Sequence, residues 1–261
     1  MSKLMQPPTI SPNLVKWFRW YCRRYARKKF HRVRLSRTSQ PLPETNGEPV
    51  VFALNHPSWW DVIFGFILSG QLPTYRHYAP IEAAMLEKYR IFRKLGLFGL
   101  DKGPRGAAQF LRTTERIFQD PFGALWITPQ GQFVDVRVRP VQLQHGIGAL
   151  ANRLTNGWIV PVALEYPFWD ESTPEALIRI GSALPIAEMS AFSVAESTAA
   201  IERAMESNMD QLALEAQSRD AEMFEDLLRG KAGVGGVYDL WRRAKSWFRG
   251  KPANLHHAQP Q

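Results

Sequence analysis

The sequence contains one cysteine and no long hydrophobic run, and both scarcities narrow the classes of protein it can belong to. Cys22 is the only cysteine among 261 residues, so no disulfide can form within the chain, which fits a reducing compartment. The longest apolar stretch, residues 62–68, is far shorter than the roughly 20 residues that span a bilayer. No apolar segment follows the early charges as it would in a secretory signal. We therefore expect neither a transmembrane helix nor export, and the cysteine and histidine spacing predicts no metal site.

Acidic residues are absent from residues 1–43, which hold eleven lysines and arginines. The whole chain has 33 Lys and Arg against 24 Asp and Glu, a net charge of +9, so acidic residues slightly outnumber basic ones outside this segment. The excess positive charge thus belongs to an N-terminal arm, residues 1–37. Such a segment binds an anionic surface, either a membrane or a nucleic acid.

The arm also carries an aromatic stripe at helical spacing, formed by Leu14, Trp17, Phe18, Tyr21 and Tyr25. Most basic side chains of the arm lie off this stripe. A basic amphipathic helix with an aromatic face is typical of the lipid interface. We expect the arm to bind an anionic membrane, on the cytoplasmic face of the inner membrane because no export signal is seen. Two alternatives remain: the aromatic residues could pack on the body of the protein, or the arm could bind nucleic acid.

After a polar linker at residues 38–49, strand and helix patterns alternate, which predicts an α/β fold with a mixed, largely parallel sheet flanked by helices. The catalytic domain is expected at 50–185. The expected strands are 50–55, 75–79, 97–100, 123–128, 158–164 and, at an edge of the sheet, 177–180. The expected helices are 57–69, 81–95, 105–118 and 141–153.

A helical C-terminal extension is expected at residues 186–249. Its composition predicts helix from 187 to about 229, and four glycines at 230–236 interrupt it. Residues 237–248 then form a second basic amphipathic pattern, which predicts a helix at a lipid interface or docked on the body. The polar tail, 250–261, is expected to be disordered.

The residues most suited to chemistry are His56 and Asp61, which follow the predicted strand 50–55. Pro57 suits the first turn of a helix, so the chain should turn from strand to helix at the histidine. Asp61 could then reach back to the imidazole. A histidine oriented by a carboxylate at such a turn is a general-base arrangement; the alternative is a capping histidine with an unrelated aspartate.

Three further segments lie near strand ends, where ligands bind in α/β sheets. Lys102 and Arg105 belong to a glycine-rich loop that opens a helix, which favours an anion. Gln130 and Gly131 follow the strand at 123–128. Val160-Pro161-Val162 places a proline within a strand, which predicts a sheet edge or a bulge.

In this order and spacing, the segments resemble the glycerophospholipid acyltransferases of the lysophosphatidic acid type. Asn55, His56 and Asp61 match the family's Asn-His-x4-Asp motif, and Val160-Pro161-Val162 matches its fourth motif. Asp101-Lys102 departs from the second motif by lysine for arginine. Residues 128–132 keep only the proline and glycine of Phe-Pro-Glu-Gly-Thr, with glutamine at position 130. Both departures suggest an acceptor that differs from simple lysophosphatidic acid.

The resemblance implies an O-acyltransferase in which His56 takes a proton from an acceptor hydroxyl and Asp61 orients the ring. The hydroxyl of a lysophospholipid or similar amphipath attacks the thioester of acyl-CoA or acyl-carrier protein, and no further cofactor is implied. Asn55, Lys102, Arg105, Gln130 and Gly131 are then expected to bind substrate, with main-chain amides near Pro57 or Gly131 stabilising the oxyanion. The alternative is a non-catalytic lipid-binding or scaffold protein of the same fold.

Overall fold

The computed structural model describes residues 7–43, 45 and 47–230. The predicted helix at 237–248 and the predicted disordered tail lie outside these residues. The described residues form one nine-stranded sheet in the order β4-β3-β5-β2-β6-β7-β1-β9, with β8 paired to β6. The strands are β1 (Arg32–Ser36), β2 (Val50–Leu54), β3 (Arg76–Glu82), β4 (Leu97–Leu100), β5 (Gly123–Ile127), β6 (Trp158–Glu165), β7 (Glu175–Ile180), β8 (Leu184–Pro185) and β9 (Phe224–Arg229).

The centre of the sheet is parallel and buried on both faces. β2 lies between β5 and β6, parallel to both, and every residue of β2 and β5 is buried. Continuous apolar sequences such as Val-Val-Phe-Ala-Leu suit strands covered on both sides. Because side chains alternate across a strand, Phe52 and Leu54 pack into one core while Val51 and Ala53 pack into the other.

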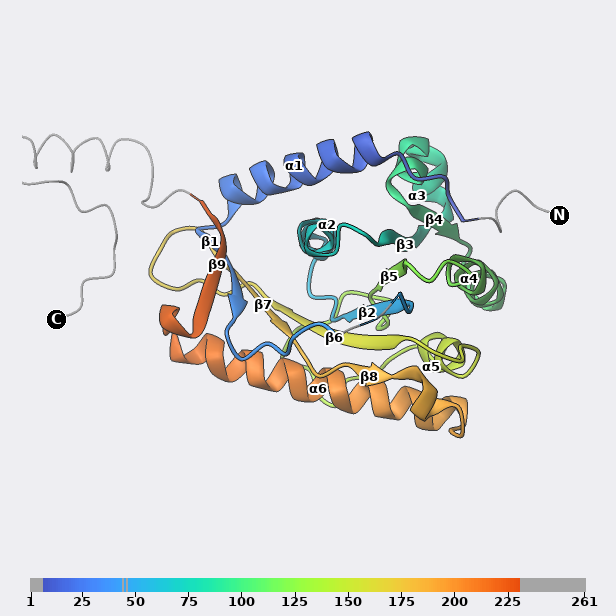
Figure 1. Cartoon of the computed structure of the whole chain (residues 1–261). Coiled ribbons are helices and arrows are strands. Elements are labelled where there is room, and N and C mark those ends of the chain that lie inside the picture. The colour runs from blue at the N-terminus through green and yellow to red at the C-terminus, as the bar shows by residue number, and fades with distance from the viewer. Residues whose placement is uncertain (1–6, 44, 46, 231–261) are drawn as a thin grey trace, which may run out of the picture.

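Two layers of helices cover the sheet (Figure 1). α1 (Pro12–Lys29) and α2 (Trp60–Leu68, followed by η2, Ser69–Gln71) lie on one face. α4 (Pro104–Ile117), α5 (Gly146–Ala151) and α6 (Val194–Ser218) lie on the other. α3 (Ala83–Lys88) and η3 (Arg90–Leu95) connect β3 to β4. The predicted α/β class, with a mixed and largely parallel sheet, is confirmed.

The sheet extends further than the sequence indicated. Residues 32–36, expected in the arm, form β1, and residues 224–229, expected as helix, form β9 after η4 (Ile186–Met189), α6 and η5 (Ala221–Met223). β1 lies between β7 and β9, so the prediction that residues 177–180 form an edge strand is wrong. Ion pairs hold this region: Arg34 contacts Glu175 at 2.9 Å and Asp226 at 3.0 Å. The arginines thus pair with carboxylates on neighbouring strands. The net positive charge of the predicted arm gave no indication of these ion pairs.

Pro161 lies in an interior strand and not at an edge of the sheet. One side of β6 pairs with β2, where Pro161 faces Ala53. On the other side, β8 pairs with Trp158 and Ile159, while β7 pairs from Val162 onward. Pro161 falls between these two partners, where the ladder needs no N–H donor.

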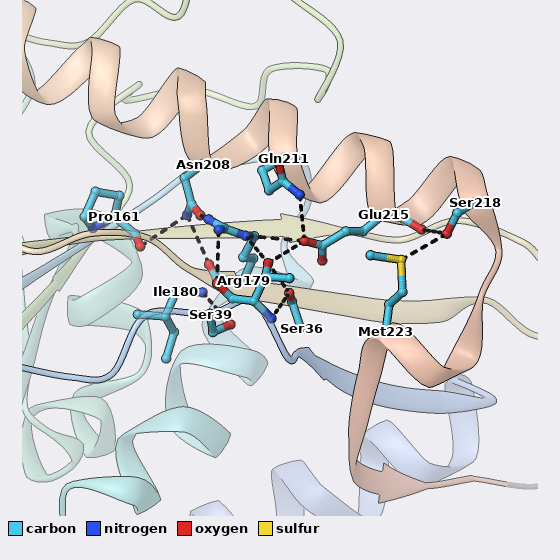
Figure 2. Close-up of polar contacts among 11 residues, drawn as sticks. Ser36, Ser39, Pro161, Arg179, Ile180, Asn208, Gln211, Glu215, Ser218 and Met223 are labelled. Atoms are coloured by element: carbon cyan, nitrogen blue, oxygen red, sulfur yellow. Dashed lines mark hydrogen bonds and ion pairs between the residues drawn. The ribbon is translucent and has the colours of Figure 1, made fainter.

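A polar cluster fixes α6 to the sheet beside this proline (Figure 2). The Nδ2 group of Asn208 donates to the carbonyls of Pro161 (3.3 Å) and Arg179 (3.1 Å). Arg179 lies 3.6 Å from the carboxylate of Glu215, which accepts a 2.5 Å hydrogen bond from the Thr38 hydroxyl. These contacts link the start of the predicted linker, β7 and α6, so α6 is part of the body.

Candidate active site

His56 and Asp61 are in direct contact where β2 ends. Nδ1 of His56 lies 2.6 Å from Oδ2 of Asp61. The same carboxylate oxygen accepts the main-chain N–H of Ser58 at 3.2 Å, so the residues before α2 form a turn around it. For this reason α2 begins at Trp60, three residues later than the sequence predicted. The predicted His–Asp pair forms, with the aspartate in the first helical turn.

The second oxygen of Asp61 has a partner that the sequence did not reveal. Asp61 is only 1% exposed, and its Oδ1 accepts a 2.6 Å hydrogen bond from the hydroxyl of Tyr166. Burial, followed by the negative charge of Asp61, raises the pKa of Tyr166 well above its usual value, so the phenol stays protonated and donates. Tyr166 directly follows β6, another strand that ends at this edge; that position was the available signal.

The backbone of His56 is held from both sides. Its N–H donates to Oε1 of Gln130 at 2.8 Å, and its carbonyl accepts from the N–H of Val134 at 2.9 Å. Gly131 turns the chain after Gln130 with a φ of 72°, a region that glycine tolerates. The N–H of Gly131 donates to the carbonyl of Thr128 and that of Ser58 donates to Asp61, so these two amides are occupied. The N–H of Gln132, next to Gly131, has no partner among the described residues.

Asn55, expected to bind substrate, joins two strands instead. Its Nδ2 donates to the carbonyl of Leu164 at 2.9 Å, and its Oδ1 accepts from the N–H of Leu164 at 2.7 Å. The side chain is buried and fully engaged. It therefore ties the end of β2 to β6 and sets the position from which His56 emerges.

A cavity of about 510 Å³ runs from His56 into the protein. Its polar lining near the histidine includes Asp61, Thr128, Gly131 and Gln132. Most of the remaining wall is apolar and comes from α1, α2, β3, η3 and β5. The apolar lining includes Phe18, Val62, Phe66, Ile81, Phe92 and Leu95. The polar His56–Asp61 pair thus lies at a largely apolar cavity.

A second histidine, His77, lines the same cavity, and both of its nitrogens are engaged by the protein. Trp126 Nε1 donates to Nδ1 at 3.0 Å. Because Nδ1 accepts, Nε2 carries the proton and donates to the Leu72 carbonyl at 2.9 Å. Burial, and to a lesser extent the charge of Arg19, lowers the pKa of His77 to about 4. His77 is therefore neutral at physiological pH.

The structure does not bring Lys102 and Arg105 into this cavity. Lys102 is 86% exposed and its Nζ lies 3.1 Å from Oε1 of Glu82. Arg105 is also exposed and lies 3.4 Å from Asp101. Neither lines the cavity. Within the described residues, no three His, Cys, Asp or Glu side chains gather to hold a metal ion.

Comparison with solved structures identifies the architecture. The fold is similar to that of "1-acyl-sn-glycerophosphate (LPA) acyltransferase, PlsC, from Thermotoga maritima", with a TM-score of 0.51 and 14% identity over 80% of this chain and 81% of that one. No protein-family model matches the sequence, and no curated protein matches it. The resemblance drawn from the four motifs is thus confirmed at the level of the fold: the chain has the α/β fold of a lysophosphatidic acid acyltransferase.

Proposed function

We propose that the protein is an O-acyltransferase that moves a fatty acyl group from a thioester, acyl-CoA or acyl-carrier protein, to a hydroxyl of a lysophospholipid or similar amphipath. The observation that carries this proposal is the 2.6 Å contact between His56 and Asp61 at the end of an apolar cavity. Among the described residues, Nε2 of His56 has no hydrogen-bond partner. With Nδ1 donating to the carboxylate, neutral His56 keeps a lone pair on Nε2 for a proton.

The reaction needs no covalent intermediate on the protein. Nε2 of His56 takes the proton of the acceptor hydroxyl as its oxygen attacks the thioester carbonyl. Asp61 stabilises the imidazolium, and Tyr166 supports the buried carboxylate. The tetrahedral intermediate collapses with cleavage of the C–S bond, and the imidazolium returns its proton to the departing thiolate. The N–H of Gln132, at the cavity wall and without a partner among the described residues, is the candidate oxyanion donor.

The apolar part of the cavity accounts for the acyl chain. An alkyl chain gains about 0.8 kcal/mol for each methylene removed from water, and the wall beyond His56 is built largely from Phe, Leu, Ile and Val side chains. Binding there places the thioester carbonyl near His56 only when the chain fills the chamber. The cavity therefore supplies both affinity and alignment.

The test is thiol release from an acyl thioester in the presence of lyso-lipid acceptors. His56→Ala should lower the rate by about 10³-fold, in the range that a general base contributes, with little change in melting temperature. Ser58→Ala is the matched neighbour: among the described residues its hydroxyl contacts only the Trp60 N–H, from which it accepts a hydrogen bond, and we expect most activity to remain. Undiminished turnover in His56→Ala refutes the proposal. A loss in Ser58→Ala as deep as in His56→Ala indicates an acyl-serine instead, and lipid binding without thiol release in the native protein indicates a scaffold.

We further propose that α1 attaches the protein to an anionic membrane, on the cytoplasmic face. Within its aromatic stripe, Phe18 packs edge-on against Phe66 at 4.8 Å, whereas Trp17 is 53% exposed. Trp20, which lies outside the stripe, is 56% exposed. Basic residues flank the exposed tryptophans, and the guanidinium of Arg24 lies 5.9 Å from the Trp20 ring. Exposed tryptophans beside cations suit the interface. In the described part of the chain, no helix combines the length and hydropathy required to cross a bilayer.

Flotation of the full chain with phosphatidylglycerol vesicles tests the attachment. The double variant Trp17→Ser/Trp20→Ser should lower the partition coefficient at least tenfold, because two exposed aromatic anchors are lost. Phe192→Ser, an exposed aromatic residue before α6, is the matched control and should bind as the native protein does. Equal binding of all three proteins, or salt-sensitive DNA retention that exceeds vesicle binding, would reject the membrane role.

A further inference from the structure

A second recess, of about 290 Å³, shares Gln132 with the main cavity and is lined by four glutamines. Gln132 lines both this recess and the main cavity. Gln130 lines the recess, and its Oε1 holds the N–H of His56. Gln144 lies against the Gly131 turn, where a Cβ would be 3.1 Å from its Cγ, and Gln142 completes the set. The recess is therefore connected to the backbone of His56 through Gln130 and to the main cavity through Gln132.

The recess offers hydrogen bonds in both directions. A glutamine amide has two N–H donors and an acceptor oxygen. The N–H groups of Gln130 have no partner among the described residues, and neither do the side chains of Gln132, Gln142 and Gln144. A hydroxyl group likewise donates and accepts. A set of neutral amides thus matches a group of hydroxyls.

Positive charge near the recess is already neutralised. Arg139 is the one charged residue in its lining. Its Nε and Nη2 lie 2.8 and 2.6 Å from Oδ1 of Asp210, and its Nη1 donates to the carbonyls of Val136 and Val138 at 2.8 Å each. Every terminal nitrogen of this guanidinium has a protein partner. It is therefore committed to holding the loop and not to a ligand.

The main cavity offers no cation either. No lysine or arginine occurs among the described residues that line it, and its charged groups, Asp61 and Glu82, are both carboxylates. The nearby cations Lys102, Arg105 and Arg137 pair with Glu82, Asp101 and Asp135. Arg19 lies outside the lining and donates to the hydroxyl and carbonyl of Ser69. A phosphate monoester carries a charge of about −1.5 to −2 at pH 7. Here it would meet the carboxylate of Asp61 and no cation in the cavity lining, which is unfavourable.

We propose that the acceptor deprotonated by His56 carries an uncharged, hydroxyl-rich head, a glycerol or a sugar on a lipid, and not a phosphate monoester. This inference rests on the acyltransferase function proposed above and assigns its acceptor class. The glutamine recess orients the head, and the reacting hydroxyl faces Nε2 of His56.

The experiment compares acceptors that share one acyl chain and differ in the head, using the full chain in mixed vesicles and one acyl thioester. The panel is monoacylglycerol, a monoacylated glucosyl lipid and lysophosphatidic acid. We expect kcat/KM for at least one neutral acceptor to exceed that for lysophosphatidic acid by tenfold or more. The two neutral acceptors distinguish glycerol from sugar as the head.

Two variants test which residues determine the acceptor preference. Gln132→Arg puts an unpaired cation into the recess and should shift the preference towards lysophosphatidic acid by at least tenfold. Lys102→Gln removes the cation that the sequence favoured as the phosphate ligand and should leave the preference within twofold. Melting temperatures accompany each measurement. Gln132→Glu introduces a charge of the opposite sign to that in Gln132→Arg, and it should not shift the preference towards lysophosphatidic acid.

The outcomes separate the two proposals. A preference of the native protein for lysophosphatidic acid, lowered in Lys102→Gln, overturns the neutral acceptor and leaves acyl transfer standing. Failure of the folded native protein to release thiol with any acceptor overturns acyl transfer, and the acceptor class with it. Preference for a neutral head, shifted by Gln132→Arg and not by Lys102→Gln, supports both.

Discussion

His56 and His77 line the same cavity, and the protein gives them opposite properties. His56 donates through Nδ1 to a carboxylate and keeps Nε2 unpaired among the described residues. His77 accepts at Nδ1 from an indole and donates through Nε2 to a carbonyl. The ring of His56 retains a lone pair, which the proposed mechanism uses for the substrate proton, whereas both nitrogens of His77 are hydrogen-bonded within the protein.

The difference shows that position in a cavity does not make a histidine a base. Burial opposes the charged form of His77 and holds its pKa near 4, and no carboxylate compensates. At His56, the buried carboxylate of Asp61 fixes the tautomer and can stabilise the imidazolium. The predictions below test this contrast from the largest expected effect to the smallest.

Asp61→Asn should cause the largest change, a loss of acyl transfer of about 10³ to 10⁴-fold. An asparagine can present its amide N–H to Nδ1, which moves the ring proton to Nε2. His56 would then have the tautomer of His77 and could no longer accept a proton from the acceptor. Thiol release measures the loss, and nitrogen chemical shifts of the ring report the tautomer.

The matched control for Asp61→Asn is Asp135→Asn. Asp135 is exposed and pairs with Arg137 at 2.7 Å, outside the cavity lining, so its removal should change the rate by less than twofold. Near-native turnover in Asp61→Asn, with the tautomer unchanged, would contradict the role of the carboxylate.

The sequence predicted the parts of this contrast that depend on neighbouring residues. The apolar run of β2 and the spacing of His56 and Asp61 predicted a His–Asp contact at a strand end, which the structure has, and Leu97–Leu100 is a strand with the predicted bounds. His77 gave no signal, because its inert state depends on Trp126, 49 residues away. Tyr166 lies 105 residues from Asp61, beyond any local pattern.

Charge was the least informative local signal. Lys102 and Arg105 suit an anion when read along the chain, but folding brings Glu82 and Asp101 to them. In the same way, the arginines of β1 meet Glu175 and Asp226 on neighbouring strands. A cation's availability depends on which carboxylates the fold brings near it, and sequence spacing does not determine this.

His77→Gln should change the pH dependence of stability by roughly 3 kcal/mol, the free energy of a pKa displaced from 6.5 to about 4. Since the folded pKa lies below the unfolded value, the unfolded state binds more protons in this window. The native protein therefore has this stability above pH 6.5 and loses it as the pH falls towards 4. Glutamine can keep both hydrogen bonds and cannot titrate.

Urea unfolding at several pH values between 7 and 4 measures this effect, as the difference between the two proteins. The free energy of unfolding of the native protein should fall more steeply with acid than that of His77→Gln. Parallel curves would show that His77 is not held neutral by burial, and the contrast with His56 would fail.

Tyr166→Phe should have the smallest effect, a fall in kcat of about tenfold, because it acts on the base only through Asp61. The phenyl ring can keep the packing against Phe30 and Phe64, so the loss isolates the 2.6 Å hydrogen bond to Oδ1. A hydrogen bond to a buried charge contributes about 1.5–3 kcal/mol, and part of it should be lost as stability. A merely structural tyrosine would lower the melting temperature and leave kcat and the His56 tautomer unchanged; a positioning residue alters both, with KM nearly constant. Steady-state kinetics and ring nitrogen chemical shifts of the same preparation distinguish these results. They also show whether Asp61, the carboxylate that makes His56 differ from His77, depends on the hydrogen bond from Tyr166.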